Sequence, residues 1–151
     1  MKKRIICCLL SLALFAWAFP IAQAAQVVDE EIIYLEDGRY IVIVTEESVS
    51  RASGTKTGSR TYYGNTSDGT TEWKAVLTGT FTYNGTTATC TNSSVSVTVY
   101  ANNWYEVSKT AGKSGASATG SVTMGRKVLG ITVAKETYDM TLTCSPTGTL
   151  S

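Results

Sequence analysis

The chain has 151 residues, with 13 Lys and Arg against 12 Asp and Glu and no His. Its small net charge gives no electrostatic attraction to nucleic acid. Without His, the commonest general base and the Ser-His-Asp triad are missing, and too few ligands remain for a zinc site. Composition therefore argues against an enzyme, a metal-binding protein and a nucleic-acid-binding protein, and no cofactor is expected.

Residues 1–24 have the pattern of a cleavable signal peptide. A basic start precedes an apolar run from Ile5 to Phe19, and Ala22-Gln23-Ala24 supplies small residues for signal peptidase. The apolar run is shorter than the roughly 20 residues that span a bilayer, which favours cleavage over a retained anchor. We expect the cut after Ala24, and a processed chain that is secreted, extracellular and not associated with the membrane.

Cleavage leaves 127 residues, a length typical of one domain, with 10 Lys and Arg against 12 Asp and Glu. It also leaves two of the four Cys, Cys90 and Cys144. Oxidising conditions outside the cell favour a disulfide between them. Such a bridge would close the loop from Cys90 to Cys144, and closing a loop of that length stabilises a fold by about 4 kcal/mol. Two unpaired buried thiols are the alternative.

The first predicted element is a β-hairpin. Residues 31–36 and 39–44 are rich in Ile, Val and Tyr and flank Asp37-Gly38, the sequence of a two-residue type I′ turn. That turn pairs Tyr34 with Ile41. Both faces of the hairpin are apolar, so either the domain covers both faces or one of them contacts a partner.

The next segment contains a loop and a second hairpin. Residues 48–60 are rich in Ser, Thr and Gly, which predicts a loop or linker. A turn signal at Asp68-Gly69 then pairs the two strands that flank it. This register places Tyr62 on the same face as Trp73, with Tyr63 facing away.

The clearest strand runs from Glu72 to Tyr83, where apolar and polar residues alternate. A two-residue turn at Asn84-Gly85 places Gly79 opposite Cys90, and the missing side chain of Gly79 leaves room for a buried disulfide. The side chains that we assign to core packing are Trp73, Leu77 and Phe81 of this strand and, from a later strand, Trp104.

Further short strands are predicted over residues 94–99, 104–109, 116–124, 127–134 and 138–144. About eight to nine short strands with tight turns and no amphipathic helix predict an all-β fold, an antiparallel β-sandwich. The expected organisation is a signal peptide (1–24), an N-terminal β-hairpin (25–47), a linker or loop (48–60) and a disulfide-stapled β-sandwich (61–151).

The order of Cys90, Trp104 and Cys144 resembles the immunoglobulin core, where a Trp packs on an inter-sheet disulfide. Leu142 stands where that family has the Tyr of its tyrosine corner. The resemblance implies an immunoglobulin-like or related sandwich with a Trp-packed bridge. It does not imply the immunoglobulin order of strands.

A second resemblance covers most of the processed chain. It rests on Asp68-Gly69 followed by Trp73-Lys74, on residues 78–85, 88–90 and 126–130, and on Leu142-Thr143-Cys144. In these motifs the chain is similar to a family of small secreted proteins from Gram-positive bacteria that has no assigned activity. The resemblance supports export and the all-β fold and implies nothing about function.

Three tyrosines, Tyr63, Tyr100 and Tyr105, are the candidates for a ligand surface. Exposed aromatic rings on a β-sandwich present large apolar faces on which a sugar can stack. The alternative is that these rings only cover their own strands.

We interpret the chain as a secreted, non-enzymatic β-sandwich with a binding or structural role at or outside the cell surface. Its partner is expected to be a protein or a glycan. A carbohydrate-binding module and a secreted toxin or bacteriocin-like protein are the alternatives. In an assembly role, the apolar hairpin at 31–44 adds to the sheet edge of a neighbour.

Overall fold

The computed structural model describes residues 25–48 and 54–151. These ranges hold eight strands: β1 (Gln26–Tyr34), β2 (Tyr40–Glu47), β3 (Thr55–Asn65), β4 (Thr71–Tyr83), β5 (Ala88–Val99), β6 (Trp104–Ser114), β7 (Ser117–Val128) and β8 (Ile131–Thr143). The predicted signal peptide and residues 49–53 of the predicted linker lie outside the described residues. In the described ranges no helix has the length and hydropathy needed to cross a membrane.

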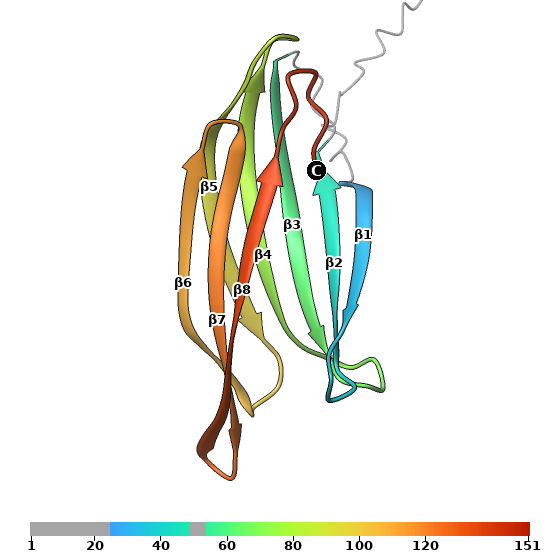
Figure 1. The fold of residues 1–151 in the computed structure, drawn as a ribbon, viewed down its shortest axis with the longest axis vertical. Coiled ribbons are helices and arrows are strands. Elements are labelled where there is room, and N and C mark those ends of the chain that lie inside the picture. The colour runs from blue at the N-terminus through green and yellow to red at the C-terminus, as the bar shows by residue number, and fades with distance from the viewer. Residues whose placement is uncertain (1–24, 49–53) are drawn as a thin grey trace, which may run out of the picture.

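Two antiparallel sheets pack face to face, which confirms the predicted all-β sandwich (Figure 1). The larger sheet has the order β1-β2-β3-β4-β5, and the smaller has the order β6-β7-β8. Within each sheet, every strand therefore pairs with its neighbours in sequence, whereas immunoglobulin sandwiches contain Greek-key connections. The smaller sheet lies over β3, β4 and β5, and the backbones of β1 and β2 extend beyond it.

The hairpin of β1 and β2 has a different register from the one predicted. Ile33, not Tyr34, lies opposite Ile41. The N–H of Leu35 donates to the carbonyl of Arg39 (2.8 Å), and the N–H of Gly38 donates to the carbonyl of Leu35 (3.1 Å). These bonds form a three-residue loop with a glycine bulge. The pairing of β1 with β2 is therefore shifted by one residue from the predicted one, which moves the side chains of β1 to the opposite face of the sheet.

The described part of the predicted linker is mostly strand. Residues 55–60 begin β3, and they pair with β2 on one side and β4 on the other. Thr and Ser favour such a pleated, half-exposed position once partner strands are present on both sides. The N-terminal hairpin is therefore part of the five-stranded sheet.

The predicted pairing of β3 with β4 is confirmed. Tyr62 lies opposite Ala75 and Tyr63 opposite Lys74, so Tyr62 faces the core and Tyr63 faces outward. The connecting loop is again longer than two residues, because the N–H of Thr66 donates to the carbonyl of Thr70 (2.9 Å). A register shift just beyond the loop compensates for the extra residue.

The predicted pairing of Gly79 with Cys90 is wrong. Phe81 lies opposite Cys90, because Asn84 organises a four-residue loop: its Oδ1 accepts from the N–H groups of Thr86 (3.0 Å) and Thr87 (2.8 Å). The predicted register is thus wrong by two residues near the turn, and an even displacement leaves Cys90 on the core face. The space at Gly79 is also occupied, since a Cβ there would lie 2.6 Å from the ring of Phe81.

The C-terminal strands are longer than predicted. A single strand was expected over residues 127–134, but the chain reverses inside this range at Leu129-Gly130. Both turn residues have positive φ (49° and 81°), as a two-residue type I′ turn requires. Leu rarely adopts such a φ, so the sequence carried no turn signal here.

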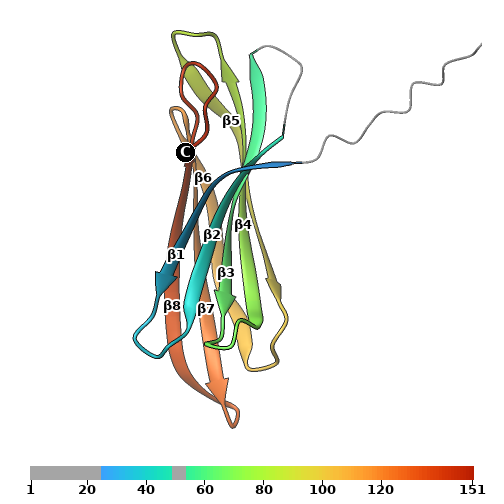
Figure 2. The same ribbon diagram turned by 90° about the vertical axis from the view of Figure 1, so that its right-hand side faces the viewer.

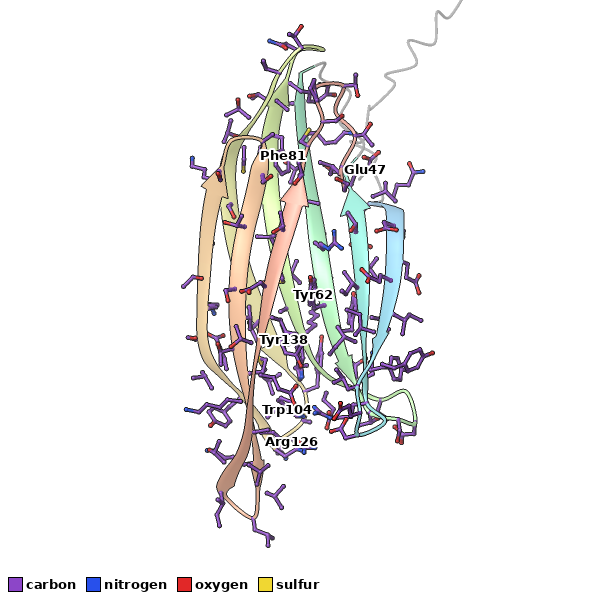
Figure 3. The ribbon with its side chains drawn as sticks, in the orientation of Figure 1. Glu47, Tyr62, Phe81, Trp104, Arg126 and Tyr138 are labelled. Carbon is purple, nitrogen blue, oxygen red and sulfur yellow. The ribbon has the colours of Figure 1, made fainter. Side chains whose placement is uncertain are left out.

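The four predicted core side chains are buried: Trp73, Leu77, Phe81 and Trp104 are 0–4% exposed. Burying a side chain of this kind contributes roughly 1.5–3 kcal/mol. The rings of Trp73 and Trp104 lie 6.0 Å apart at one end of the sandwich. Phe81 lies near the other end, as Figure 3 shows.

Candidate binding surfaces

Strand β1 forms a free edge of the larger sheet. It pairs with β2 on one side and with no described strand on the other. All nine of its residues are exposed, whereas Ile41 and Ile43 of β2 are each only 3% exposed. Ile41 and Ile43 belong to the buried core cluster, which includes no residue of β1.

Both faces of β1 display apolar side chains. Tyr34 is 77% exposed and Ile32 is 46% exposed on the outer face, while Ile33 is 42% exposed on the opposite face. The ring of Tyr34 lies 5.9 Å from that of Tyr40 on β2. Large apolar groups on an unpaired edge are unusual, because natural sheet edges are normally blunted by charge, proline or a covering element.

The open edge presents regularly spaced backbone groups. Leu35 and Arg39 are a hydrogen-bonded pair, and such pairs alternate along an antiparallel ladder. Ile32 and Tyr34 therefore lie in non-hydrogen-bonded pairs, with their N–H and C=O groups directed away from β2. An extended chain placed alongside β1 finds donors and acceptors at these positions.

The middle of β1 is acidic. Asp29, Glu30 and Glu31 are consecutive and exposed. Arg60 of β3 lies 3.7 Å from Glu31, a long contact that leaves much of the acidic charge unpaired. The edge thus combines negative charge at its centre with apolar side chains at both ends.

An ion-pair cluster ties the β1–β2 loop to β8. Arg39 lies 2.7 Å from Asp37 and 2.8 Å from Glu136, and its guanidinium stacks 5.1 Å from the centre of the Trp104 ring. Burial alone would lower the pKa of Arg39, but its hydrogen bonds to Glu136 and Asp37 outweigh burial and raise it. The bond from Arg39 lowers the pKa of Asp37.

An open hollow of about 410 Å³ lies beside this cluster, lined by Leu35, Glu36, Asp37, Arg39, Glu136 and Tyr138. The hydroxyl of Tyr138 donates to Glu136. Burial, and then the bond to Glu136, raise the pKa of Tyr138 well above its ordinary value, so the phenol stays protonated. The side chains of Asp37, Arg39, Glu136 and Tyr138 are bonded to one another, which suits a structural tether.

The three predicted ligand-surface tyrosines are not brought together. Tyr63 lies on the outer face of the larger sheet beside Val42, and Tyr105 lies on the outer face of the smaller sheet over Gly125. Tyr100 follows the end of β5 and is 55% exposed. Since Tyr63 and Tyr105 occupy opposite outer faces, these rings do not form one platform for a sugar.

The cysteines Cys90 and Cys144 are buried and are free thiols in the structure. Their N–H groups donate to adjacent carbonyls of the β6–β7 turn, Cys90 to Gly115 (2.8 Å) and Cys144 to Ala116 (3.0 Å). Burial raises the pKa of both thiols, which disfavours the reactive thiolate. The disulfide therefore stays a prediction.

The predicted packing of Trp104 on a Cys90–Cys144 bridge is wrong. Trp104 begins β6, whereas Cys90 bonds to the turn that follows the other end of that strand. Figure 3 places Trp104 far from Phe81, the residue opposite Cys90. The 11 residues of β6 separate the two groups.

Sequence reasoning left open whether the 31–44 hairpin is covered by its own domain, and it missed the apolar tip of the β7–β8 hairpin. Within the described ranges, no three His, Cys, Asp or Glu side chains gather as a metal ion would require.

Comparisons with protein-family models, with curated proteins and with solved structures found no match for the chain. The interpretation of these surfaces therefore rests on their geometry.

Proposed function

We propose that the processed chain is an exported, non-enzymatic binding module that receives an extended segment of a partner protein on the free edge of β1. The observation that carries this proposal is the open edge itself, with Ile32 and Tyr34 exposed at 46% and 77%. In strand addition, backbone hydrogen bonds supply affinity and alternate side chains supply specificity.

The charge of β1 defines the partner's chemistry. Two copies of β1 paired antiparallel around Glu30 place Asp29 opposite Glu31, and like charges directly opposite destabilise a sheet. Self-association in this register is therefore disfavoured. A partner segment with basic residues opposite this acidic stretch and apolar residues beside Ile32 and Tyr34 complements the edge.

Export belongs to the same proposal. The basic start, apolar run and small-residue cleavage site of residues 1–24 support it, as does the resemblance to secreted proteins. The proposal also includes a Cys90–Cys144 disulfide. Oxidising conditions outside the cell favour such a bridge, and both residues are buried in one core cluster. Mass spectrometry of the exported chain is expected to show the loss of two hydrogens relative to the reduced chain, and an unchanged mass would contradict the bridge.

The binding proposal is tested with a displayed library of peptides as long as β1, selected on the immobilised processed chain. Enriched peptides should be extended, with basic and apolar residues. In hydrogen exchange, they should protect the amides of Ile32 and Tyr34, which point to the open edge.

The variant Ile32→Pro removes one outward N–H at an edge position that tolerates proline. It should reduce peptide affinity roughly tenfold, the worth of one hydrogen bond left unmade. The matched control Ile32→Val keeps the donor and the apolar surface and should bind like the parent. Failure to enrich any peptide, or equal binding to Ile32→Pro, would refute strand addition.

A further inference from the structure

The tip of the β7–β8 hairpin exposes a cluster of large apolar side chains. Leu129 is 98% exposed, more than any other large hydrophobic residue described, and Ile131 is 70% exposed. Val128 and Val133 are each 51% exposed. The hairpin projects beyond the neighbouring loops in both side views, as Figures 1 and 2 show.

The conformation of Leu129 is costly for the fold. Its φ of 49° lies in the left-handed region, where a type I′ turn favours Asn, Asp or Gly. Its side chain meets almost no other part of the chain, so it adds nothing to the core. A large apolar residue in a strained turn, fully exposed, indicates a role outside the fold.

The base of the tip is basic. Residues 126–135 contain Arg126, Lys127 and Lys135 and no acidic residue, although the processed chain as a whole has more Asp and Glu than Lys and Arg. Lys127 and Lys135 are exposed. The local charge is therefore opposite to that of the rest of the chain.

An aromatic ring lies at the same level as these cations. The ammonium of Lys127 lies 4.6 Å from the centre of the Tyr105 ring, and the Tyr105 hydroxyl lies 2.9 Å from the Thr132 hydroxyl. Tyr is enriched at membrane interfaces, where its amphipathic ring lies at the level of the headgroups. The order from the tip inward is apolar, then aromatic and cationic.

We propose that this tip inserts into the surface of an anionic lipid bilayer. Leu129, Ile131 and their valine neighbours enter the boundary between headgroups and acyl chains, and Lys127 and Lys135 contact anionic headgroups. The apolar part of each strand spans roughly 10 Å including the turn, which matches the 5–10 Å depth that is typical of interfacial anchors. Charge complementarity selects an anionic lipid surface over a neutral one.

Acidic residues at the same end of the molecule limit the contact to the tip. Glu36 and Asp37 lie in the β1–β2 loop and Asp68 in the β3–β4 loop, and Asp37 is already paired with Arg39. These loops end short of the β7–β8 hairpin in both views (Figures 1 and 2). The anchor departs from the sequence-based expectation that the processed chain is not associated with a membrane, and it is independent of the β1 edge.

The test is co-sedimentation of the processed chain with vesicles of phosphatidylglycerol and phosphatidylcholine, compared with vesicles of phosphatidylcholine alone. The chain from Ala25 contains all eight strands and lacks the apolar N-terminal run. Binding is expected to the anionic vesicles only, and to weaken at about 1 M salt, where the Debye length is roughly 3 Å.

The variant Leu129→Asn suits the turn and removes the apolar anchor, so it should reduce vesicle binding roughly tenfold or more while preserving the fold. The variant Lys127→Gln should reduce binding about fivefold. The control Val107→Thr removes exposed apolar surface from β6, where Val107 is 40% exposed, and should bind like the parent.

A fluorescence measurement separates insertion from adsorption. Trp73 and Trp104 are buried, so Leu129→Trp adds the one tryptophan that reports on the tip. Its emission should shift to the blue with anionic vesicles. No sedimentation with these vesicles, equal binding to neutral vesicles, or equal binding by Leu129→Asn and Val107→Thr would overturn the proposal, and in the last case the tip would be assigned to a protein contact.

Discussion

Replacing Gly79 by Ala tests the observed packing around this residue, where Phe81 and Ala118 occupy the space that the sequence assigned to a disulfide. In the structure, a Cβ at Gly79 lies 2.6 Å and 2.8 Å from two atoms of the Phe81 ring and 2.9 Å from the Cβ of Ala118. Phe81 and Ala118 are both fully buried between the sheets. Neither has solvent into which it can move, so the added methyl has to displace the ring or the opposing strand.

Overpacking of this kind costs about 1–3 kcal/mol. The reduced freedom of the unfolded chain offsets up to about 1 kcal/mol of it, so we expect Gly79→Ala to lower the free energy of unfolding by about 1–2 kcal/mol. Urea unfolding followed by the fluorescence of the buried Trp73 and Trp104 measures this change.

A double-mutant cycle identifies the cause. Phe81→Leu removes the clashing part of the ring, so Gly79→Ala should cost less in that background, with a coupling of at least about 0.5 kcal/mol. The control is Gly112→Ala on β6, where the closest contact is the flexible Thr119 hydroxyl at 3.0 Å. It should change stability by less than about 0.5 kcal/mol. Equal effects at Gly79 and Gly112, or strict additivity with Phe81→Leu, would refute the observed packing.

Three other outcomes are expected. Arg39→Met removes the ion pairs to Asp37 and Glu136 and leaves Glu136 partly buried without its cation. It should lower the free energy of unfolding in urea by about 1–2 kcal/mol and speed hydrogen exchange in β1. An unchanged exchange rate would contradict the role of this cluster in tying the β1–β2 loop to β8. Leu129→Asn should raise the free energy of unfolding by about 0.5–1 kcal/mol, because Asn tolerates positive φ better than Leu, and a loss of stability would contradict the type I′ turn. Because the pKa of Tyr138 is raised, first by burial and then by Glu136, the folded chain keeps a proton that the unfolded chain loses near pH 10. This stabilisation is complete below about pH 10 and is lost as the pH rises further. Tyr138→Phe should therefore reduce the fall of the free energy of unfolding above pH 10, and the same pH dependence in variant and parent would contradict the raised pKa of Tyr138.

Much of the larger sheet follows from the sequence alone. Alternation from Glu72 to Tyr83 identifies a strand and the face that carries Trp73, Leu77 and Phe81, and the structure buries all three. The pairing of Tyr62 with Ala75 also follows from a turn signal. These features depend on the period of two, which local sequence records directly.

Loop length was less predictable. An Asp-Gly or Asn-Gly pair suits a two-residue turn and also supplies the positive φ of longer loops. At Gly38 and at Asn84 the longer loop forms, stabilised by hydrogen bonds to Leu35 and to Thr87. The competing loops differ by bonds that exist only when the strands are already paired, so the sequence does not discriminate between them.

The candidate binding surfaces depend on the tertiary structure. Ile33 of β1 and Ile41 of β2 are the same residue type on neighbouring strands, yet they are 42% and 3% exposed. Ile41 belongs to the buried core cluster between the sheets, whereas no residue of the edge strand β1 does. Likewise, the sequence around Leu129 predicts an ordinary apolar strand, and only the turn in the structure shows that Leu129 is exposed to solvent.

The sequence by itself determined that this chain is built of antiparallel strands around a core that includes Trp73, Phe81 and Trp104, because side-chain alternation is a local property. It also carries the export signal that we propose. Only the tertiary structure decided which apolar residues stay exposed, since burial depends on which strands a second sheet covers. The free edge of β1 and the tip of the β7–β8 hairpin, the two surfaces to which we assign binding, both arise at that level.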